Sequence, residues 1–258
     1  MSNSAAQSTL IINADDFGLS ERDNQAILAS FEQSVITSAT LMANMPFFAQ
    51  ACQLAKTQKI DKQLGLHFNL TYGKPLSRDI SLIDCICNSD GEFDFSIPRH
   101  SLFLSKHITA AIYQELEQQW QACLDNGITP THIDSHQHVH NLMPVARVVA
   151  AFARKKAVPV RLARNIGKNI SALKSVFKFF LNWQITRQAK TSVRYTCTPR
   201  DLLDGLKPAG VIEIICHPKR LADGRLGDDY LPDDIALQDV IAAAYPTAAK
   251  ISYGELSQ

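Results

Sequence analysis

Carboxylates and imidazoles gather at four places in this 258-residue chain, each at the end of a short apolar run. The four clusters are residues 13–18 (NADDFG), 67–69 (HFN), 135–140 (SHQHVH) and 217–218 (HP). Side chains so far apart in sequence can act together only if the fold brings the ends of those runs to one place. Parallel α/β folds do so, because all their strands end on one face. The pattern therefore predicts a metal-dependent hydrolase.

The adjacent carboxylates Asp15 and Asp16 indicate a bound cation. Two aspartates side by side at a strand end repel each other unless a positive charge offsets the repulsion. A divalent metal ion does this, since one carboxylate can ligate the ion while the other acts as a base. Two imidazoles would complete a three-ligand site that leaves positions open for water and a substrate oxygen.

Four histidines are candidates for those imidazole ligands: His67, His136, His138 and His140. If residues 135–140 continue a strand, the alternate histidines share one face, whereas in a helix His136 and His140 do. The spacing leaves open which imidazole binds. A lone histidine in an apolar run is often a core residue, but three of the chain's eight histidines within five residues favour a functional cluster.

Strand-like and helix-like runs alternate along the chain, which implies a parallel sheet. The predicted strands are 10–12, 38–42, 64–70, 128–135, 158–162, 210–216 and 251–253, and the predicted helices are 24–32, 47–56, 109–126, 144–156, 170–188 and 233–244. The clearest helix has an apolar stripe at Ile112, Leu116, Trp120 and Cys123, with Gly127 as its C-cap. Residues 210–216 are nearly all β-branched or apolar, as expected for a strand buried on both faces.

The length and the absence of internal repeats favour a single domain over residues 1–258, because α/β barrels often form one domain of ~250 residues. Residues 73–107 are the least regular stretch, with Pro75 and a turn-like NSDG sequence. We interpret them as an insertion after the third strand that shapes a substrate pocket. A disordered excursion over part of this stretch is the alternative.

Composition excludes several classes of protein. No run approaches the ~20 apolar residues of a transmembrane helix, and residues 1–9 lack the basic and apolar segments of a secretory signal. The six cysteines form no Cys-x-x-Cys pair, so they are expected to be reduced thiols of a cytoplasmic protein rather than metal ligands.

Charge is distributed unevenly. Residues 135–200 contain thirteen Lys or Arg and no Asp or Glu, whereas residues 201–239 contain nine acidic residues. Solvated helix faces balanced by the acidic stretch are the simplest explanation. The aromatic residues 177, 179, 180 and 183 lie among these basic residues, so peripheral contact with an anionic glycolipid or membrane is a second possibility. A packed outer helix or a homodimer contact would also explain the aromatics. Nucleic-acid binding lacks a motif to support it.

The clusters also resemble a known family. Residues 13–20 (NADDFGLS), 65–71 (GLHFNLT), 131–140 (THIDSHQHVH) and 216–218 (CHP) together resemble the YdjC-like carbohydrate deacetylases, as do residues 37–40 (TSAT) and 73–76 (GKPL). This family includes chitooligosaccharide deacetylases and deacetylase-like proteins associated with hopanoid biosynthesis. The resemblance covers nearly the whole chain and implies a distorted (β/α) barrel, TIM-barrel-like and related to the polysaccharide deacetylases.

The resemblance also implies roles for eight side chains. The metal ligands would be Asp16, His67 and His136, which would hold one divalent metal ion. Asp15 would be the general base, and His217 would protonate the departing amine or stabilise the tetrahedral intermediate. The substrate would be contacted by Arg161, His138 and His140. Magnesium or zinc is expected, with nickel or cobalt as alternatives. Residues 167–198 depart most from the family pattern, so the substrate within the class stays open.

The implied reaction is removal of an N-acetyl group from an amino-sugar-containing carbohydrate or glycolipid, with release of acetate. An amide needs a polarised carbonyl, an activated water and an acid for the leaving amine, and a metal ion with Asp and His residues supplies all three. The alternatives are a metal- and carbohydrate-binding protein without turnover, a hydrolase of a different acyl amide or ester, and a non-haem iron oxygenase. The alternating β/α pattern argues against the oxygenase.

Overall fold

The computed structural model describes residues 8–168, 170–189 and 191–256. Over these residues a seven-stranded sheet runs in the order β4-β3-β2-β1-β6-β5, with β9 beside β1. Its strands are β1 (Thr9–Phe17), β2 (Ser38–Leu41), β3 (Leu64–Phe68), β4 (Ile133–Ser135), β5 (Tyr195–Cys197), β6 (Val211–Cys216) and β9 (Ala249–Lys250). All of its strand pairs are parallel. A separate antiparallel hairpin follows β6, made of β7 (Pro218–Arg220) and β8 (Leu226–Asp228).

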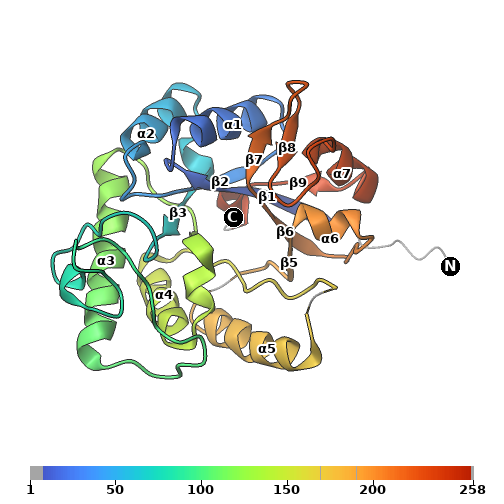
Figure 1. The fold of residues 1–258 in the computed structure, drawn as a ribbon. Coiled ribbons are helices and arrows are strands. Elements are labelled where there is room, and N and C mark those ends of the chain that lie inside the picture. The colour runs from blue at the N-terminus through green and yellow to red at the C-terminus, as the bar shows by residue number, and fades with distance from the viewer. Residues whose placement is uncertain (1–7, 169, 190, 257–258) are drawn as a thin grey trace.

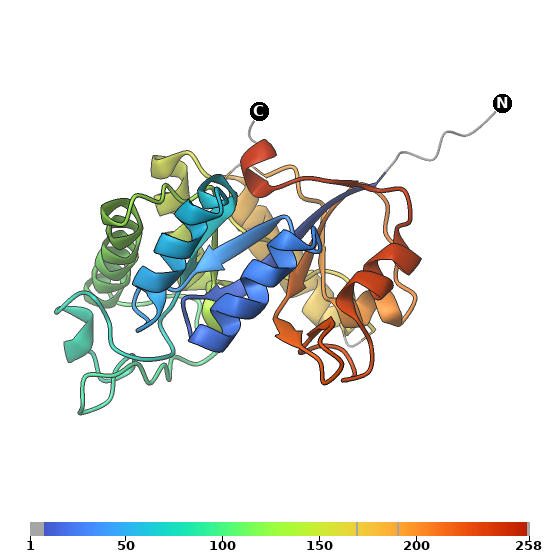
Figure 2. The ribbon, with the colours of Figure 1, turned by 90° about the horizontal axis from the view of Figure 1, so that it is seen from above.

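Helices surround the curled sheet, as Figures 1 and 2 show. They are α1 (Glu21–Glu32), α2 (Phe48–Thr57), α3 (Lys106–Asp125), α4 (Met143–Lys156), α5 (Ala172–Thr186), α6 (Pro199–Leu203) and α7 (Leu237–Ala244). Most of the core lies between this outer layer and the strands. The arrangement is the predicted distorted (β/α) barrel.

Local sequence signals explain most of these elements. The predicted stripe on α3 is buried, and Gly127 follows the helix with a φ of +76°, as expected of a C-terminal glycine cap. Helix α1 begins at a Ser20 cap, whose side chain accepts a hydrogen bond from the Asp23 N–H. Strand β6 is buried along nearly its whole length, which its β-branched sequence predicted.

The predicted strand at residues 158–162 forms only one isolated parallel bridge, between Val160 and Ile133 of β4. Pro159 has no N–H to donate, so a regular ladder cannot form here. The Pro159 carbonyl accepts from the Ile133 N–H at 3.0 Å, and the Arg161 N–H donates to the Ile133 carbonyl at 2.9 Å. This short contact is enough to place Arg161 at the edge of β4.

The same segment reaches the opposite edge of the sheet through one side chain. The Asn165 amide donates to the Arg194 carbonyl and accepts from the Thr196 N–H of β5, both at 3.0 Å. Residues 160–165 therefore bridge the gap between β4 and β5. The barrel is completed by one backbone bridge and one side chain instead of a continuous ladder.

The structure differs from the predicted elements in two ways: some predicted elements have other bounds or do not form, and some observed elements were not predicted. Residues 251–253 are not a strand, because a capping box between Ser252 and Glu255 starts a 3₁₀ turn at Tyr253–Glu255. Helix α7 begins at Leu237 rather than at residue 233, and the Asp234 carbonyl is held outside it by Arg225. Strand β5, helix α6 and the β7–β8 hairpin were not predicted, because their three to five residues are too few to show a periodic pattern of apolar residues.

The stretch 73–107 lies between β3 and α3 and contains a 3₁₀ turn and one bridge, between Cys87 and Phe93. Its start is fixed to α3, where the Glu115 carboxylate accepts from the N–H groups of Leu76 and Ser77. Its interpretation as an insertion in a single domain stays a prediction. Across the described residues, no helix has both the length and the apolar character needed to span a bilayer. All six cysteines are free.

Gly65→Ala tests how tightly the barrel interior is packed. A Cβ at position 65 would lie 2.5 Å from the ring of His132, a buried residue stacked on Tyr253. We expect the substitution to lower the free energy of unfolding by about 1–3 kcal/mol, because neither ring can move freely. Urea unfolding measures this loss. Combining the change with His132→Ala should relieve the clash, so strictly additive effects of the two substitutions would contradict the packing described.

Candidate metal centre and active site

Both carboxylates of the Asp15-Asp16 pair reach the same space at the end of β1. Successive strand residues normally point to opposite faces. Here the pairing with β2 shifts register between Ala14 and Phe17, and Asp16 has a φ of +68°, in the left-handed region. As a result an oxygen of each aspartate lies within 4 Å of one atom, the His217 Nε2 (3.9 Å from Asp15, 3.7 Å from Asp16). The pair is therefore part of a bulged strand, not of a loop beyond it.

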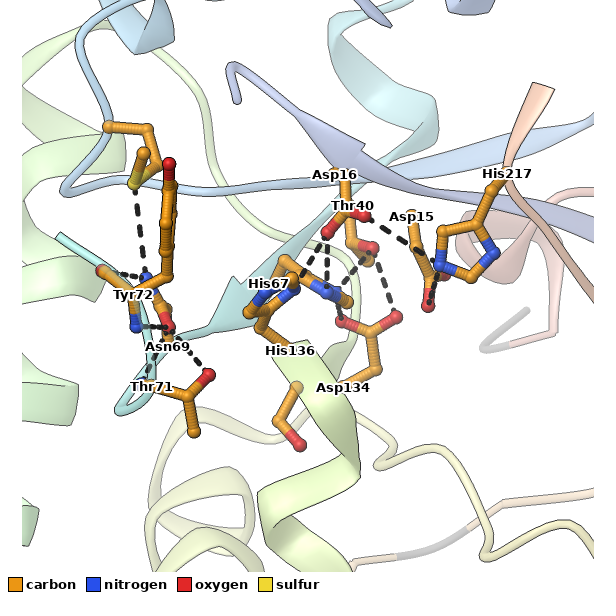
Figure 3. Close-up of polar contacts among 12 residues, drawn as sticks. Asp15, Asp16, Thr40, His67, Asn69, Thr71, Tyr72, Asp134, His136 and His217 are labelled. Atoms are coloured by element: carbon orange, nitrogen blue, oxygen red, sulfur yellow. Dashed lines mark hydrogen bonds and ion pairs between the residues drawn. The ribbon is translucent and has the colours of Figure 1, made fainter. Parts of the chain in front are cut away.

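Asp16, His67 and His136 form a compact cluster (Figure 3). The Asp16 Oδ1 lies 3.1 Å from the His67 Nε2 and 3.0 Å from the His136 Nδ1. Burial favours a higher pKa for Asp16, but hydrogen bonds from His136 and His67 outweigh it and hold the pKa well below its usual range. Three ligand atoms from an anionic carboxylate and two imidazoles fit a divalent metal ion with open positions. These residues could hold one.

A buried carboxylate orients His67 from behind. The His67 Nδ1 lies 2.7 Å from Asp134 Oδ1, and the Thr40 hydroxyl donates to Asp134 Oδ2 at 2.9 Å. Burial would lower the pKa of His67, but the charges of Asp134 and Asp15 raise it well above its ordinary value. A proton on Nδ1 directed at Asp134 leaves Nε2 facing Asp16. This is the carboxylate–histidine arrangement commonly found behind metal-binding imidazoles.

The three histidines after β4 separate because the chain kinks there. The 3₁₀ segment His136–Asn141 contains positive φ values at Gln137 (+47°) and His138 (+55°), so neither the strand nor the regular-helix alternative holds. His136 alone of the three lies beside Asp16. His140 is fully buried, with its Nδ1 against the Ser135 hydroxyl, and burial lowers its pKa well below the ordinary value. A buried, bonded His140 is not positioned to contact a substrate.

Whereas His140 is buried, His138 is partly exposed, as His136 is. Burial, with a smaller contribution from Arg161, lowers its pKa to about 4, so its imidazole is neutral near pH 7. A contact with the substrate at this position stays a prediction.

Arg161 lies inside the barrel rather than at its rim. Its side chain is 1% exposed, and two of its nitrogens donate to the two oxygens of Asp15, each at 2.7 Å. It also lies 2.8 Å from Asp134 and donates to Glu213 of β6 at 2.6 Å. The expectation that Arg161 reaches the substrate therefore does not match its position, because its guanidinium is enclosed by carboxyl groups from three strands. It orients Asp15 from behind.

Burial and Arg161 act differently on two of these carboxyl groups. Burial raises the pKa of Asp15, but Arg161 and His67 together lower it well below the usual range, so Asp15 is an anion. Burial raises the pKa of Glu213 to about 7 despite the single bond from Arg161. Glu213 is therefore the member of this network that can take up a proton near neutral pH.

His217 lies beside Asp15 and Asp16 (Figure 3). It follows β6, its side chain is 26% exposed, and its backbone N–H donates to Asp228 at 2.6 Å. Its ring makes an edge contact with the ring of Tyr230, at a centroid distance of 5.2 Å. The β7–β8 hairpin thus positions His217 next to both aspartates.

Sequence reasoning missed four residues of this site: Thr40, Tyr72, Asp134 and Glu213. Asp134 and Glu213 lie within apolar strand runs, and a charged residue in such a run must be paired when buried, which was the available signal. Tyr72 is 54% exposed, and its ring centroid lies 6.5 Å from that of His136. No pattern in the sequence indicated Tyr72.

A curled parallel sheet with an Asp-His-His cluster at its strand ends defines an α/β-barrel protein with a candidate metal centre. A solved structure from Enterococcus faecalis, of a candidate cellobiose-phosphate cleavage protein, has this fold. The TM-score is 0.71 at 23% sequence identity, with 98% of this chain and 100% of that chain covered.

The YdjC-like protein family model matches residues 9–248, so the chain belongs to the YdjC-like family. A carbohydrate deacetylase from Geobacillus stearothermophilus is 38% identical over 211 residues, which cover 81% of this chain and 78% of that protein. A chitooligosaccharide deacetylase from Klebsiella pneumoniae is 31% identical over 252 residues, or 95% of each chain. The resemblance seen in the motifs is confirmed.

Asp134→Asn tests the proposed support of His67. We expect affinity for a divalent metal to fall about 10–100-fold, because an amide cannot hold the Nδ1 proton as a carboxylate does. Isothermal titration with Zn²⁺ and with Mg²⁺ measures the change. Asp201→Asn is the matched control, since Asp201 is also buried and paired with an arginine, Arg164, but outside the cluster. Equal affinities for wild type and Asp134→Asn would contradict the support.

Glu213→Gln should remove a pH-dependent loss of stability. The pKa of Glu213 is higher in the folded state (about 7) than its ordinary 4.5, so the folded state binds a proton more tightly and wild-type stability falls as pH rises through this window. Glutamine does not titrate. The variant should therefore gain stability relative to wild type between these pH values, on the order of 3 kcal/mol, and no further above them. Urea unfolding at several pH values measures this; a pH-independent difference would contradict it.

Proposed function

We propose that this protein is a metal-dependent hydrolase that removes the N-acetyl group from an amino-sugar unit of a carbohydrate or glycolipid and releases acetate. The observation that carries the proposal is the position of Asp15. Its carboxylate is held anionic by Arg161 and lies beside the Asp16-His67-His136 cluster and His217. The carbohydrate deacetylases among its relatives support the substrate class.

Asp16, His67 and His136 would hold one divalent ion, such as magnesium, zinc, nickel or cobalt. When bound, such an ion polarises the amide carbonyl and lowers the pKa of water. The cluster fits this ion because its three donors converge while Asp134 holds the far side of His67. The proton transfers of the reaction would then fall to Asp15 and His217.

Asp15 is placed to accept a proton from the attacking water. Two bonds from Arg161 fix its carboxylate plane and leave it deprotonated throughout the neutral range. His217 is placed to donate a proton to the amide nitrogen as its bond to the carbonyl carbon breaks. The water oxygen forms the new bond to that carbon, and the products are acetate and a free amine. With the His217 Nε2 3.9 Å from Asp15, the two groups can serve the same substrate.

Two features of the site support a sugar substrate and turnover. The exposed ring of Tyr72 beside His136 offers an apolar surface against which a sugar ring can stack. A protein that only bound metal and carbohydrate would gain nothing from a second, anionic carboxylate held beside the cluster. The His217 side chain is 26% exposed while Asp15 is buried beside it, which suits an accessible acid and a base held away from bulk water.

Acetate release from a panel of N-acetylated substrates tests the proposal. The panel holds N-acetylglucosamine, its oligomers and an N-acetylated glycolipid, each assayed with Mg²⁺, Zn²⁺, Co²⁺ or Ni²⁺. We expect Asp15→Asn and His217→Ala each to lower kcat about 10²–10⁴-fold without loss of bound metal, because each removes a proton transfer. His136→Ala should lose metal as well.

Asp239→Asn is the control, since this aspartate is exposed on α7 and outside the site. It should leave acetate release unchanged. Release that survives Asp15→Asn and His217→Ala would contradict the assigned roles. No release from any substrate, by protein with one metal ion bound, would contradict the deacetylase function itself.

A further inference from the structure

Helix α5 turns large apolar side chains away from the protein. Six of its large apolar side chains are exposed: Leu173 (81%), Val176 (54%), Phe177 (38%), Phe179 (67%), Phe180 (54%) and Trp183 (49%). Leu173, Val176, Phe180 and Trp183 follow the spacing i, i+3, i+7 and i+10, which places them on one side of the helix. We call these six residues the α5 face.

The opposite side of α5 already contacts the core. Leu181 and Ile185 are fully buried, and the Asn182 amide donates to the Ala163 carbonyl and accepts from its N–H, at 3.1 and 2.8 Å. Figure 1 shows α5 along the outer edge of the molecule. Packing against the barrel therefore explains Leu181 and Ile185 but leaves the α5 face without a structural role.

The α5 face is surrounded by positive charge. No Asp or Glu occurs in residues 135–200, while Lys168, Lys174 and Arg187 are exposed near the helix ends. The Arg187 guanidinium lies 4.5 Å from the centre of the Trp183 ring. Exposed aromatic and aliphatic side chains combined with basic residues are the composition of helices that lie in the interface of a negatively charged bilayer.

From this geometry we propose that the α5 face binds the surface of an anionic lipid membrane. Phe180 and Trp183 would enter the interfacial region, where aromatic rings are favoured, while Lys174 and Arg187 contact lipid phosphates. A twofold dimer formed through this face would instead bring like charges of the two copies together, because a twofold interface pairs a patch with itself. The charge pattern thus favours a membrane over a second copy.

The α5 face is mechanically connected to the active site. Lys178 donates to the Arg164 carbonyl at 2.6 Å, and Asn182 holds Ala163, so α5 is fixed to the segment that carries Arg161. Membrane docking would then present the site to lipid-linked N-acetylated sugars. That consequence rests on the proposed deacetylase function, whereas membrane binding itself does not.

Vesicle sedimentation tests the proposal. One set of vesicles is pure phosphatidylcholine and the other contains equal parts of phosphatidylcholine and phosphatidylglycerol. We expect binding to the anionic set only, weakened by salt, and reduced about tenfold or more by Phe180→Ser/Trp183→Ser and by Lys174→Glu/Arg187→Glu. Leu82→Ser/Phe103→Ser is the control, since these apolar side chains are even more exposed (74% and 77%) but lie on another segment. It should bind as wild type does.

Trp183 gives a second readout on the intact protein. The chain has two tryptophans, and Trp120 is buried at 4% exposure, so a Trp120→Phe variant reports on Trp183 alone. Its fluorescence should shift to shorter wavelength with anionic vesicles. Absence of binding to anionic vesicles, binding unchanged by both α5 variants, or a dimer that Phe180→Ser/Trp183→Ser dissociates would each overturn the proposal. Acetate release from a soluble sugar, unchanged in these variants, separates this outcome from failure of the proposed function.

Discussion

The structure depends on one buried cation, the guanidinium of Arg161. It contacts Asp15 from β1, Asp134 from β4 and Glu213 from β6, and its side chain is almost completely removed from solvent. Removing one member of such a network leaves an uncompensated buried charge, which costs several kcal/mol. The segment that carries Arg161 also completes the barrel between β4 and β5. The closure of the fold and the charge balance of its interior are therefore the same feature.

The Arg161 network also positions two side chains of the candidate site, His67 and Asp15. Asp134 contacts Arg161 on one side and His67 on the other, so it links the interior cation to an imidazole of the candidate metal centre. Asp15 links the same cation to the position where a substrate would react. The left-handed backbone at Asp16, Gln137 and His138 costs free energy, and it persists because the surrounding contacts hold it. Asp15 and His67 are thus each supported by a charged side chain behind them.

Charges are paired differently in the interior of the barrel and on the surface around α5. Inside the barrel, every charged group in the Arg161 network has an opposite charge within contact distance. Around α5, basic residues surround exposed aromatic rings with no acidic residue of their own segment to balance them. A surface of this kind is expected where a protein meets something other than water. Residues 161–164 connect the two regions, because Arg161 belongs to the interior network while Ala163 and Arg164 are hydrogen-bonded to α5.

The sequence by itself determined the class of fold and which strand ends contribute to the site. Alternating runs predicted a parallel sheet, and polar residues at strand ends predicted that Asp15, Asp16, His67, His217 and the histidines of residues 136–140 would converge, because parallel strands end on one face. Only the tertiary structure decided which imidazole faces Asp16, since that choice depends on the positive φ values at Gln137 and His138. The position of Arg161 was also decided by the tertiary structure. The sequence predicted this side chain at the rim, but it lies in the interior, because its buried charge is paired with carboxyl groups from three strands that are distant in sequence. Spacing encodes where strands end, whereas long-range charge pairing decides where a side chain points.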